Sequence, residues 1–379
     1  MGLRNWLAPG GIALCAVLAA GCAGPAPVPG PPGLGAAATG AQAGPALPLT
    51  PAPGRATVSE TGSTLLFPLM RAWAGAYESQ HPGITVTTGG TGSGTGIKDA
   101  SDGSAEIGAS DAFLSAGQLV SNPALLNVPL VVSAQQVDYN VPGLSPNVHL
   151  SLDGPVLAQM YQGTITAWND PAIERLNPGV HLPGTPVVPL HRADSSGDTF
   201  LFTSYVSTHD PAWSSAIGYG TTVAWPAAPR AASAQGNSGM VTACAGQPGC
   251  VAYIGISYLS QALSSGLGEA QLANTLGQYV LPTSATIAAA VSSFVSSTPA
   301  GGTISMIDGP APGGYPIVNY EYAIVSTRQR SAAQARDIRA FLHWAITTGS
   351  AAQYLAPQRL VQLPPDVMAQ SDAQIEKIR

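Results

Sequence analysis

Hydrophobic positions along the chain follow two periods, which predicts a mixed α/β fold. In residues 68–79 apolar side chains recur three and four positions apart, the spacing of a helix with one buried face. Residues 84–87 follow as a short strand. A glycine-rich loop over 89–96 then leads to a second helix, which is expected to begin at Ile97.

The same alternation continues to the C-terminus. Buried strands are expected at 105–111, 128–132, 187–190, 251–256 and 316–325. Helices are expected at 155–161, from Pro171 to a stop at Pro178-Gly179, at 200–206 and at 331–348, with Gly349 as the stop of the last one. Strand, glycine-rich turn and helix start repeat, which favours an open sheet with a ligand at the carboxyl ends of its strands.

The N-terminus predicts an export signal. Residues 7–20 form an apolar stretch that is too short to span a membrane, and it ends in the sequence Leu-Ala-Ala-Gly-Cys22. This ending resembles a bacterial lipobox, although Ala19 stands where an aliphatic residue is usual. Residues 1–22 are therefore interpreted as a lipoprotein signal, with Cys22 as the lipid acceptor. The alternative is an ordinary secretory signal that is cut elsewhere.

Residues 23–56 are dominated by Pro, Ala and Gly and contain one charged residue, Arg55. Such a segment cannot bury a core, and it predicts a flexible tether. Residues 57–379 are long enough for two domains, each with its own core.

Charge and cysteine content narrow the function classes. Only 9% of the residues are charged and the net charge is −6, which excludes a typical nucleic-acid binder. Two of the four cysteines, Cys15 and Cys22, belong to the signal. In an exported protein the remaining pair, Cys244 and Cys250, predicts a short-loop disulfide. The six histidines are scattered, so no metal site is expected.

Three polar segments have the composition of an anion site: residues 62–65, 92–96 and 192–199. Each leads into an expected helix, whose first turn offers free N–H groups and the positive end of the dipole. Thr64 and Ser93 add hydroxyl groups. Simpler interpretations are a helix cap at Ser63 or Thr64 and a plain glycine-rich loop.

The third segment supplies the cation. Arg192 offers a fork that grips tetrahedral oxyanions, and Asp194 can orient it. Ser196 and Gly197 add a hydroxyl and a backbone N–H at a helix start. The simpler interpretation is a surface Arg–Asp pair beside a helix cap.

Asp111, between the second and third segments, is unusual in an anion site because a carboxylate repels an anion. It fits a ligand that donates a proton to it, as phosphate can and sulfate cannot. A buried acceptor of this kind rejects analogues by factors on the order of 10⁴. The alternative is an Asp that caps the turn after a strand.

Six stretches together resemble one protein family, the periplasmic phosphate-binding proteins of the PstS type, and within it the mycobacterial and actinobacterial lipoprotein members. They are GSTLLFPLMRAWAGAY, GGTGSGTGIKDA, AEIGASDAFLS, HRADSSGDTFLFTSY, GCVAYIGISYLSQA and PIVNYEYAIV. The resemblance implies a hinged, two-lobed α/β fold of the class II periplasmic-binding-protein type, with phosphate bound dehydrated in the cleft.

The resemblance also implies residue roles. Hydroxyl donors would be Thr64, Ser93 and Ser196, and backbone N–H donors would be Leu65 and Gly197. Asp111 would accept the phosphate proton, and Arg192 would be the cation, steadied by Asp194. Asp198 stands where enterobacterial members have Thr, so it either accepts a second phosphate proton or turns away to form a salt bridge.

The resemblance further implies that lobe I contains residues 57–133 and 316–379 and that lobe II contains residues 134–315. The expected function is capture of inorganic phosphate by a lipid-anchored protein on the outer face of the cell membrane and delivery to the permease of an ABC importer. The protein is expected to be a monomer without cofactor and not an enzyme. The alternatives are a receptor for sulfate or arsenate and an exported hydrolase of phosphate esters, which would need a metal cluster or an activated nucleophile.

Overall fold

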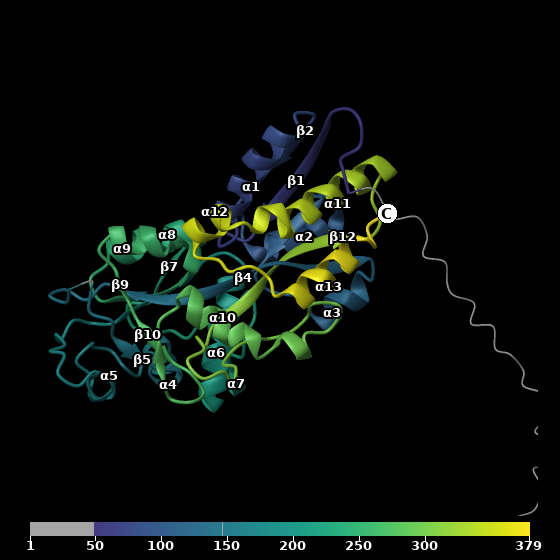
Figure 1. Ribbon diagram of the computed structural model, residues 1–379. Helices are drawn as coiled ribbons and strands as arrows, with labels where there is room; N and C mark the ends of the chain where they lie inside the picture. The colour runs from purple at the N-terminus through teal and green to yellow at the C-terminus, as the bar shows by residue number, and fades with distance from the viewer. Residues whose placement is uncertain (1–48, 146) are drawn as a thin grey trace, which may run out of the picture. The chain divides into compact units, whose positions relative to one another are not determined.

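A mixed β-sheet runs through the protein, which we describe from a computed structural model covering residues 49–145 and 147–379 (Figure 1). In these residues the sheet has the strand order β2-β1-β3-β12-β4-β8-β6-β7, and β9 pairs with β4. Its strands are β1 (Ala56–Gly62), β2 (Ile84–Thr87), β3 (Ile107–Ser110), β4 (Leu125–Tyr139), β6 (Val188–Arg192), β7 (Ala232–Ala234), β8 (Cys250–Gly255), β9 (Gly268–Glu269) and β12 (Val318–Ser326). A separate small sheet has the order β11-β10-β5, with β5 (Ser151–Leu152), β10 (Gln271–Ala273) and β11 (Tyr279–Val280).

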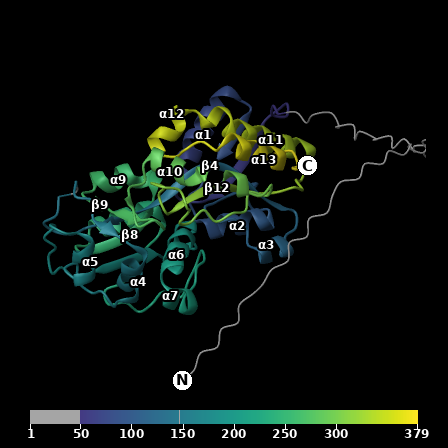
Figure 2. The same cartoon turned by 60° about the horizontal axis from the view of Figure 1, so that its bottom comes forward.

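Helices cover both halves of the large sheet (Figures 1 and 2). The first half carries α1 (Phe67–Gln80), α2 (Ser93–Asp102), α3 (Ala116–Ser121), α11 (Ala332–Ile346), α12 (Ala352–Leu355) and α13 (Pro365–Ile375). The second half carries α4 (Gly154–Gln162), α5 (Pro171–Leu176), α6 (Gly197–His209), α7 (Pro211–Ala216), α8 (Gly236–Ala245), α9 (Leu259–Ser264) and α10 (Ser284–Ser292). Short 3₁₀ turns are η1 (Ile256–Tyr258), η2 (Val295–Ser297), η3 (Thr348–Ser350) and η4 (Ala356–Gln358).

The long strand β4 changes partners along its length. Its first part pairs antiparallel with β12, ending with Ala134 opposite Val318. From Gln135, opposite Gly255, it pairs antiparallel with β8. The parallel strands β2-β1-β3 therefore lie on one side of the β12–β4 pair, and the parallel strands β8-β6-β7 lie on the other.

Each half of the sheet has its own aromatic core. In the first half the ring of Tyr77 meets Phe341 edge-on at 5.1 Å. In the second half Phe202 stacks on Tyr253 at 4.6 Å. All four side chains are fully buried, so each half contributes its own apolar packing.

The structure contains the expected strands and helices, but two helices begin earlier than expected. Helix α11 ends at Ile346, before the expected stop at Gly349, which lies in η3. Helix α2 begins at Ser93 rather than Ile97, and α6 begins at Gly197 rather than Phe200. The polar glycine-rich segments are themselves the first helical turns, which a pattern of apolar positions cannot show. Strand β1 was not predicted, because its buried Glu60 interrupts the apolar pattern.

The end of the Pro/Ala/Gly-rich segment is attached to the fold. The backbone N–H of Ala52 donates to Asp337 of α11 at 2.7 Å, and Arg336 donates to the carbonyl of Thr50. Ala56 already pairs with Ile84 in the sheet. Residues 1–48, including the expected signal and Cys22, lie outside the described part.

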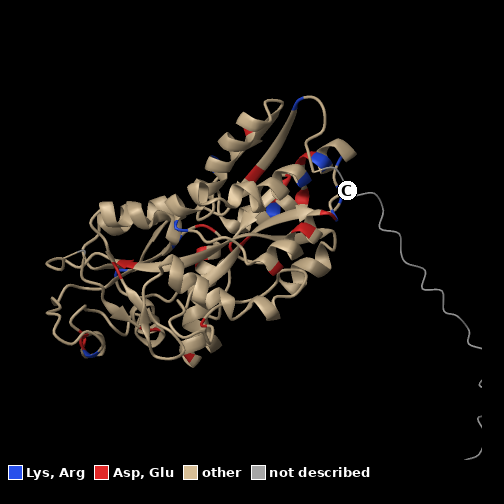
Figure 3. Cartoon of the chain, viewed as in Figure 1, with Lys and Arg blue, Asp and Glu red and all other residues tan. Residues whose placement is uncertain are grey.

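Figure 3 shows charged residues spread thinly over the part of the chain that is described, as the composition implies. Within residues 49–145 and 147–379, no helix combines the length and hydrophobicity needed to cross a membrane.

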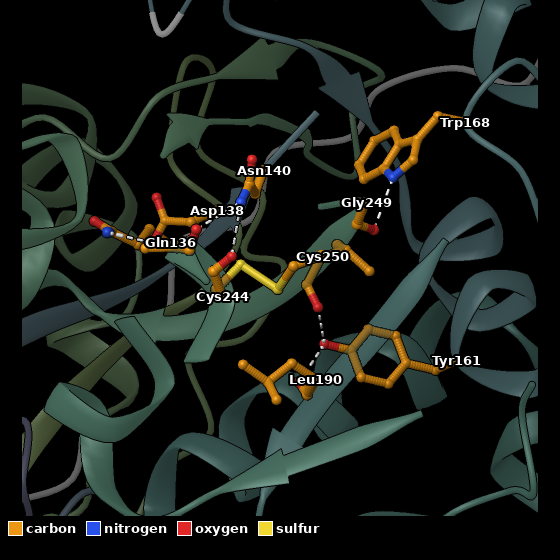
Figure 4. The surroundings of a disulfide bond; sticks show 11 residues. Gln136, Asp138, Asn140, Tyr161, Trp168, Leu190, Cys244, Gly249 and Cys250 are labelled. Atoms are coloured by element: carbon orange, nitrogen blue, oxygen red, sulfur yellow. Dashed lines mark hydrogen bonds between the residues drawn. A yellow bond between two sulfur atoms is a disulfide. The ribbon is translucent and has the colours of Figure 1, made fainter. Parts of the chain in front are cut away.

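A disulfide joins the end of α8 to the start of β8 (Figure 4). Cys244 and Cys250 have Cα atoms 5.3 Å apart, within the usual range for a disulfide. Around them, Asn140 donates to the Cys244 carbonyl and the Trp168 indole donates to the Gly249 carbonyl, both at 2.9 Å. The bridge therefore fixes a turn that is already tied to its surroundings by hydrogen bonds.

Candidate functional site

The three polar segments meet where the two halves of the sheet face each other. The start of α2 from the first half contacts the start of α6 from the second, and the N–H of Gly94 donates to the Ser195 carbonyl at 3.1 Å. The predicted site residues are all brought into this region and are mostly buried: Thr64, Leu65, Ser93, Asp111, Arg192, Asp194, Ser196, Gly197 and Asp198. The structure thus gathers residues that are up to 134 positions apart in the numbering of the chain into one cluster.

Asp111 follows β3 directly, and its two carboxylate oxygens face different groups. Oδ1 accepts a hydrogen bond from the hydroxyl of Ser63. Oδ2 lies against Gly197, so close that a Cβ on that glycine would be 2.5 Å away. The Asp111 N–H donates to the Ser93 hydroxyl at 3.2 Å. One oxygen is therefore held from behind while the other faces the start of α6.

Arg192, at the end of β6, is held by two carboxylates. Its Nε donates to Asp194 at 2.8 Å, its Nη2 donates to the other oxygen of Asp194, and its Nη1 donates to Asp198 at 2.6 Å. A guanidinium has five N–H groups. These contacts use three of them and leave one N–H on each terminal nitrogen, which suits a two-point grip on an oxyanion.

The ionisation of this cluster follows from its burial and charges. Burial would lower the pKa of Arg192, but Asp194 and Asp198 outweigh it and raise that pKa above its usual range. Burial would likewise raise the pKa of Asp194, and the hydrogen bonds and charge of Arg192 outweigh it, so this pKa is lowered. The Arg192–Asp194 pair is therefore fully ionised at neutral pH.

Asp198 is completely buried and makes polar contacts on every side. Besides Arg192, it accepts from the amide groups of Asn237 at 2.7 Å and Gln135 at 3.2 Å. Burial and the neighbouring charge of Asp111 raise the pKa of Asp198 to about 7. Asp198 has therefore not turned away from the site, because its salt bridge is with Arg192.

Asn237, at the start of α8, links the two halves and was missed from the sequence. Its side-chain amide donates to the Thr64 hydroxyl at 2.9 Å as well as to Asp198, and its oxygen accepts from the N–H of Gly255 at 2.8 Å. Gly236-Asn237-Ser238-Gly239 is another glycine-rich helix start, so the same sequence signal as at 92–96 was present.

Backbone donors remain available at the cluster. Within residues 49–145 and 147–379, the N–H groups of Leu65 and Gly197 have no hydrogen-bond partner. The Leu65 carbonyl is fixed from the second half by the Ser257 hydroxyl at 2.6 Å. Together with the hydroxyl groups of Thr64 and Ser196, these N–H groups can bind an anion without further positive charge.

Glu321 of β12 is a second residue that the sequence analysis missed. It is fully buried behind Asp111, and its Oε1 accepts from the Ser133 hydroxyl at 2.5 Å. A charged residue in the middle of the apolar run 316–325 was the available signal.

Next to Arg192, in the second half of the sheet, lies a cavity of about 420 Å³. Hydroxyl groups of Thr221 and Thr222 line it together with His191, which stacks on Trp225 at 4.8 Å. Within the described residues, no group of three or more His, Cys, Asp or Glu is arranged to hold a metal ion.

Comparisons with known proteins identify the family. A family model described as a PBP superfamily domain matches residues 48–348. The "Phosphate-binding protein PstS" of Methanocaldococcus jannaschii is 33% identical over 338 residues, which cover 83% of this chain and 84% of that relative. The chain belongs to the PstS family of phosphate-binding proteins.

Other members and solved structures agree with this assignment. "Phosphate-binding protein PstS 3" of Mycobacterium leprae is 31% identical and covers 83% of this chain and 85% of its own length. A periplasmic phosphate-binding protein named PfluDING, solved with phosphate, has a TM-score of 0.67 at 21% identity, covering 84% of this chain and 93% of that one. A phosphate transport receptor from Vibrio cholerae has a TM-score of 0.52 at 19% identity. The match covers 81% of this chain and 100% of that receptor.

The PstS family assignment confirms the expected two-lobed α/β fold. It also confirms the expectation of a binding protein rather than an enzyme, since the relatives are named as binding proteins and transport receptors.

Proposed function

We propose that this protein binds inorganic phosphate and delivers it to the permease of an ABC importer. One observation carries the proposal. A buried carboxylate, Asp111, faces the start of α6 beside an Arg192 that keeps two free N–H groups. A proton acceptor and a cation at one place suit an oxyanion that still carries a proton.

The ligand lies between Asp111 and Arg192 and is bound by donors from both halves. The hydroxyl groups of Thr64, Ser93 and Ser196 donate to phosphate oxygens, as do the N–H groups of Leu65 and Gly197. Asp111 Oδ2 accepts the phosphate proton. Asp194 and Asp198 hold the Arg192 guanidinium in position and do not contact the ligand.

The two halves of the sheet are the two lobes of a hinged receptor. We assign residues 57–133 and 316–379 to lobe I and residues 134–315 to lobe II, because β4 changes partner between Ala134 and Gln135. β4 and β12 connect the lobes, and a hinge at these strands opens and closes the cleft.

The protein is anchored by lipid at Cys22, on the outer face of the cell membrane. Residues 23 to about 49 form the tether, because Thr50 is already bonded to α11. Export also brings the Cys244–Cys250 pair into an oxidising compartment, where the disulfide forms. A monomer is the working state.

Purified protein tests the proposal directly. Calorimetric titration is expected to show one inorganic phosphate bound per chain. Incubation with p-nitrophenyl phosphate is expected to release no phosphate. Hydrolysis of the ester without binding of free phosphate would instead support the exported hydrolase. Arsenate binds as phosphate does in this proposal, because it carries a proton at neutral pH, whereas sulfate does not bind.

A further inference from the structure

A serine connects Asp111 to the second buried carboxyl group, Glu321. The Ser63 hydroxyl donates to Asp111 Oδ1, and Ser63 Oγ also lies 3.5 Å from Glu321 Oε2. The other Glu321 oxygen, Oε1, accepts from Ser133 at 2.5 Å. Glu321 is therefore placed on the side of Asp111 that faces away from the start of α6.

The number of protons available in these contacts decides which group donates and which group accepts. Ser63 has one hydroxyl proton, and Asp111 receives it. The N–H of Leu66 donates to Ser63 Oγ at 3.0 Å. Contact of Ser63 Oγ with Glu321 Oε2 is favourable only when Oε2 carries a proton, since two bare oxygens repel each other. The geometry thus fits a neutral Glu321 behind an ionised Asp111.

The surrounding charges favour the same state. The titratable groups that face Glu321 are Asp111 after β3 and Asp198 of α6, with Tyr320 and Tyr322 beside it on β12. The nearby cation, Arg192, is already shared by two carboxylates. Burial first, then the charge of Asp111 and a direct hydrogen bond between the two carboxyl groups, raise the pKa of Glu321 well above its usual range.

We propose that Glu321 is a positioning residue that acts on Asp111, directly and through Ser63, and sets the highest pH at which this site binds phosphate. This inference rests on the proposed function. While Glu321 is protonated, the Ser63 proton stays on Asp111 Oδ1, and Oδ2 is left to accept the phosphate proton. When Glu321 ionises, it competes for the Ser63 proton and adds a buried negative charge beside an anion site. Phosphate affinity then falls.

Three variants separate this role from a structural one. Glu321→Gln keeps the size, the donor to Ser63 and the acceptor for Ser133, but it cannot ionise. The Ser133 hydroxyl donates to Oε1 and so stabilises the ionised form of Glu321. Ser133→Ala removes this donor and moves ionisation of Glu321 to higher pH. Glu60→Gln is the matched control, because Glu60 is also a buried carboxyl but has no hydrogen-bond partner among the described residues.

The test is calorimetric titration of inorganic phosphate from pH 6 to 10 at fixed ionic strength. Affinities are compared with the parent at each pH, which cancels the ionisation of phosphate itself. Glu321→Gln is expected within about threefold of the parent at pH 6. Above the pH at which Glu321 begins to ionise, the phosphate affinity of the parent is expected to decrease relative to that of this variant by about tenfold per pH unit. Ser133→Ala should shift the onset upward, and Glu60→Gln should overlay the parent.

Two results would overturn the inference. One is a folded Glu321→Gln protein whose affinity parallels that of the parent at every pH. The other is loss of binding at every pH in that variant, which would mean that the ionised form of Glu321 is needed. If Glu321→Gln does not fold, an unchanged onset in Ser133→Ala overturns it instead. A parent that binds no phosphate at any pH would refute the proposed function, which is a different outcome.

Discussion

At the scale of single residues, the site relies on one cation whose charge is already balanced. Arg192 is bonded to Asp194 and Asp198, so most of the attraction for an anion has to come from neutral donors. This is consistent with a chain of net charge −6. What Arg192 contributes is geometry: two remaining N–H groups at fixed positions.

Arg192→Lys tests this geometric role. Lysine keeps the charge but cannot bond two carboxylates and still offer two fixed donors to a ligand. Loss of two charge-assisted hydrogen bonds predicts that phosphate affinity falls by about a hundredfold or more. Calorimetric titration at pH 7 measures the change, with the exposed Arg175→Lys on α5 as control. An Arg192→Lys protein with parental affinity would contradict the role assigned to the guanidinium.

Glu60 gives a second prediction, this time about stability. Burial raises its pKa from 4.5 to about 8. The folded state therefore holds a proton that the unfolded state has lost between these pH values, so the free energy of unfolding decreases as the pH rises through that window and levels off above pH 8. Over the whole window the loss amounts to roughly 5 kcal/mol, of which roughly 4 kcal/mol falls between pH 5 and pH 9.

Glu60→Gln should remove this loss. Urea unfolding measures the free energy of unfolding of each protein at pH 5 and at pH 9. The change between the two pH values is then compared between parent and variant, because other groups titrate equally in both proteins. We expect that difference to be smaller in the variant by roughly 4 kcal/mol. The exposed Glu376→Gln is the control. Equal pH dependence in Glu60→Gln and the parent would show that Glu60 is not buried in its neutral form.

Much of the site could be predicted at this scale, because hydroxyl, glycine and arginine residues were grouped in short segments. Glu321 and Asn237 stand in recognisable segments, but their roles could not be predicted, since their partners come from distant elements. Asn237 is positioned by Thr64, 173 residues away, and Glu321 faces Ser63, 258 residues away. Only the packed sheet brings these pairs together.

At the scale of elements, the starts of α2 and α6 form the walls of the site. Gly197 is the first residue of α6, and its backbone lies against the Asp111 side chain. A side chain at this position would push the start of the helix away from the carboxylate. Close approach, rather than an unusual backbone angle, is therefore the reason for glycine here.

Gly197→Ala should lower phosphate affinity by at least about tenfold, since its Cβ would lie 2.5 Å from both Cβ and Oδ2 of Asp111. Gly75→Ala is the matched control inside α1, where an added Cβ meets no atom within 4 Å. That control should keep parental affinity and gain up to about 1 kcal/mol of stability. Equal affinities for both alanine variants would show that the close contact between α6 and Asp111 does not matter for phosphate binding.

The sequence pattern predicted the buried strands and amphipathic helices well, but it misplaced elements whose residues serve the site. Helices α2 and α6 begin with polar turns, so apolar periodicity starts late in each. Strand β4 continues to Tyr139 through buried Gln135, Gln136 and Asp138, which look like the end of a strand in sequence. In both cases polar residues are buried for reasons that lie in other elements.

At the scale of the whole molecule, the structure has the contacts of a closed receptor. Among the described residues, hydrogen bonds join three residue pairs across the two halves close to the site: Gly94 and Ser195, Asn237 and Thr64, and Ser257 and Leu65. A hinge at β4 and β12 would break all three on opening without disturbing either core. In the function we propose, phosphate takes donors from both lobes and therefore stabilises the closed form.

Small-angle X-ray scattering tests this closure. Adding phosphate should decrease the radius of gyration, whereas sulfate at the same ionic strength should leave it unchanged. Identical scattering curves with and without saturating phosphate would mean that the lobes do not move on binding.

Asp111 is the residue on which the choice of phosphate rests, and Asp111→Asn tests that choice most directly. Asparagine keeps the size of the side chain, but its amide can donate and so no longer requires a protonated ligand. Phosphate and sulfate are titrated calorimetrically against the parent and the variant at fixed salt and pH. The account predicts that selectivity against sulfate falls by a factor on the order of 10² or more, while phosphate affinity falls less. A variant that excludes sulfate as strongly as the parent would contradict Asp111 as the proton acceptor of the site.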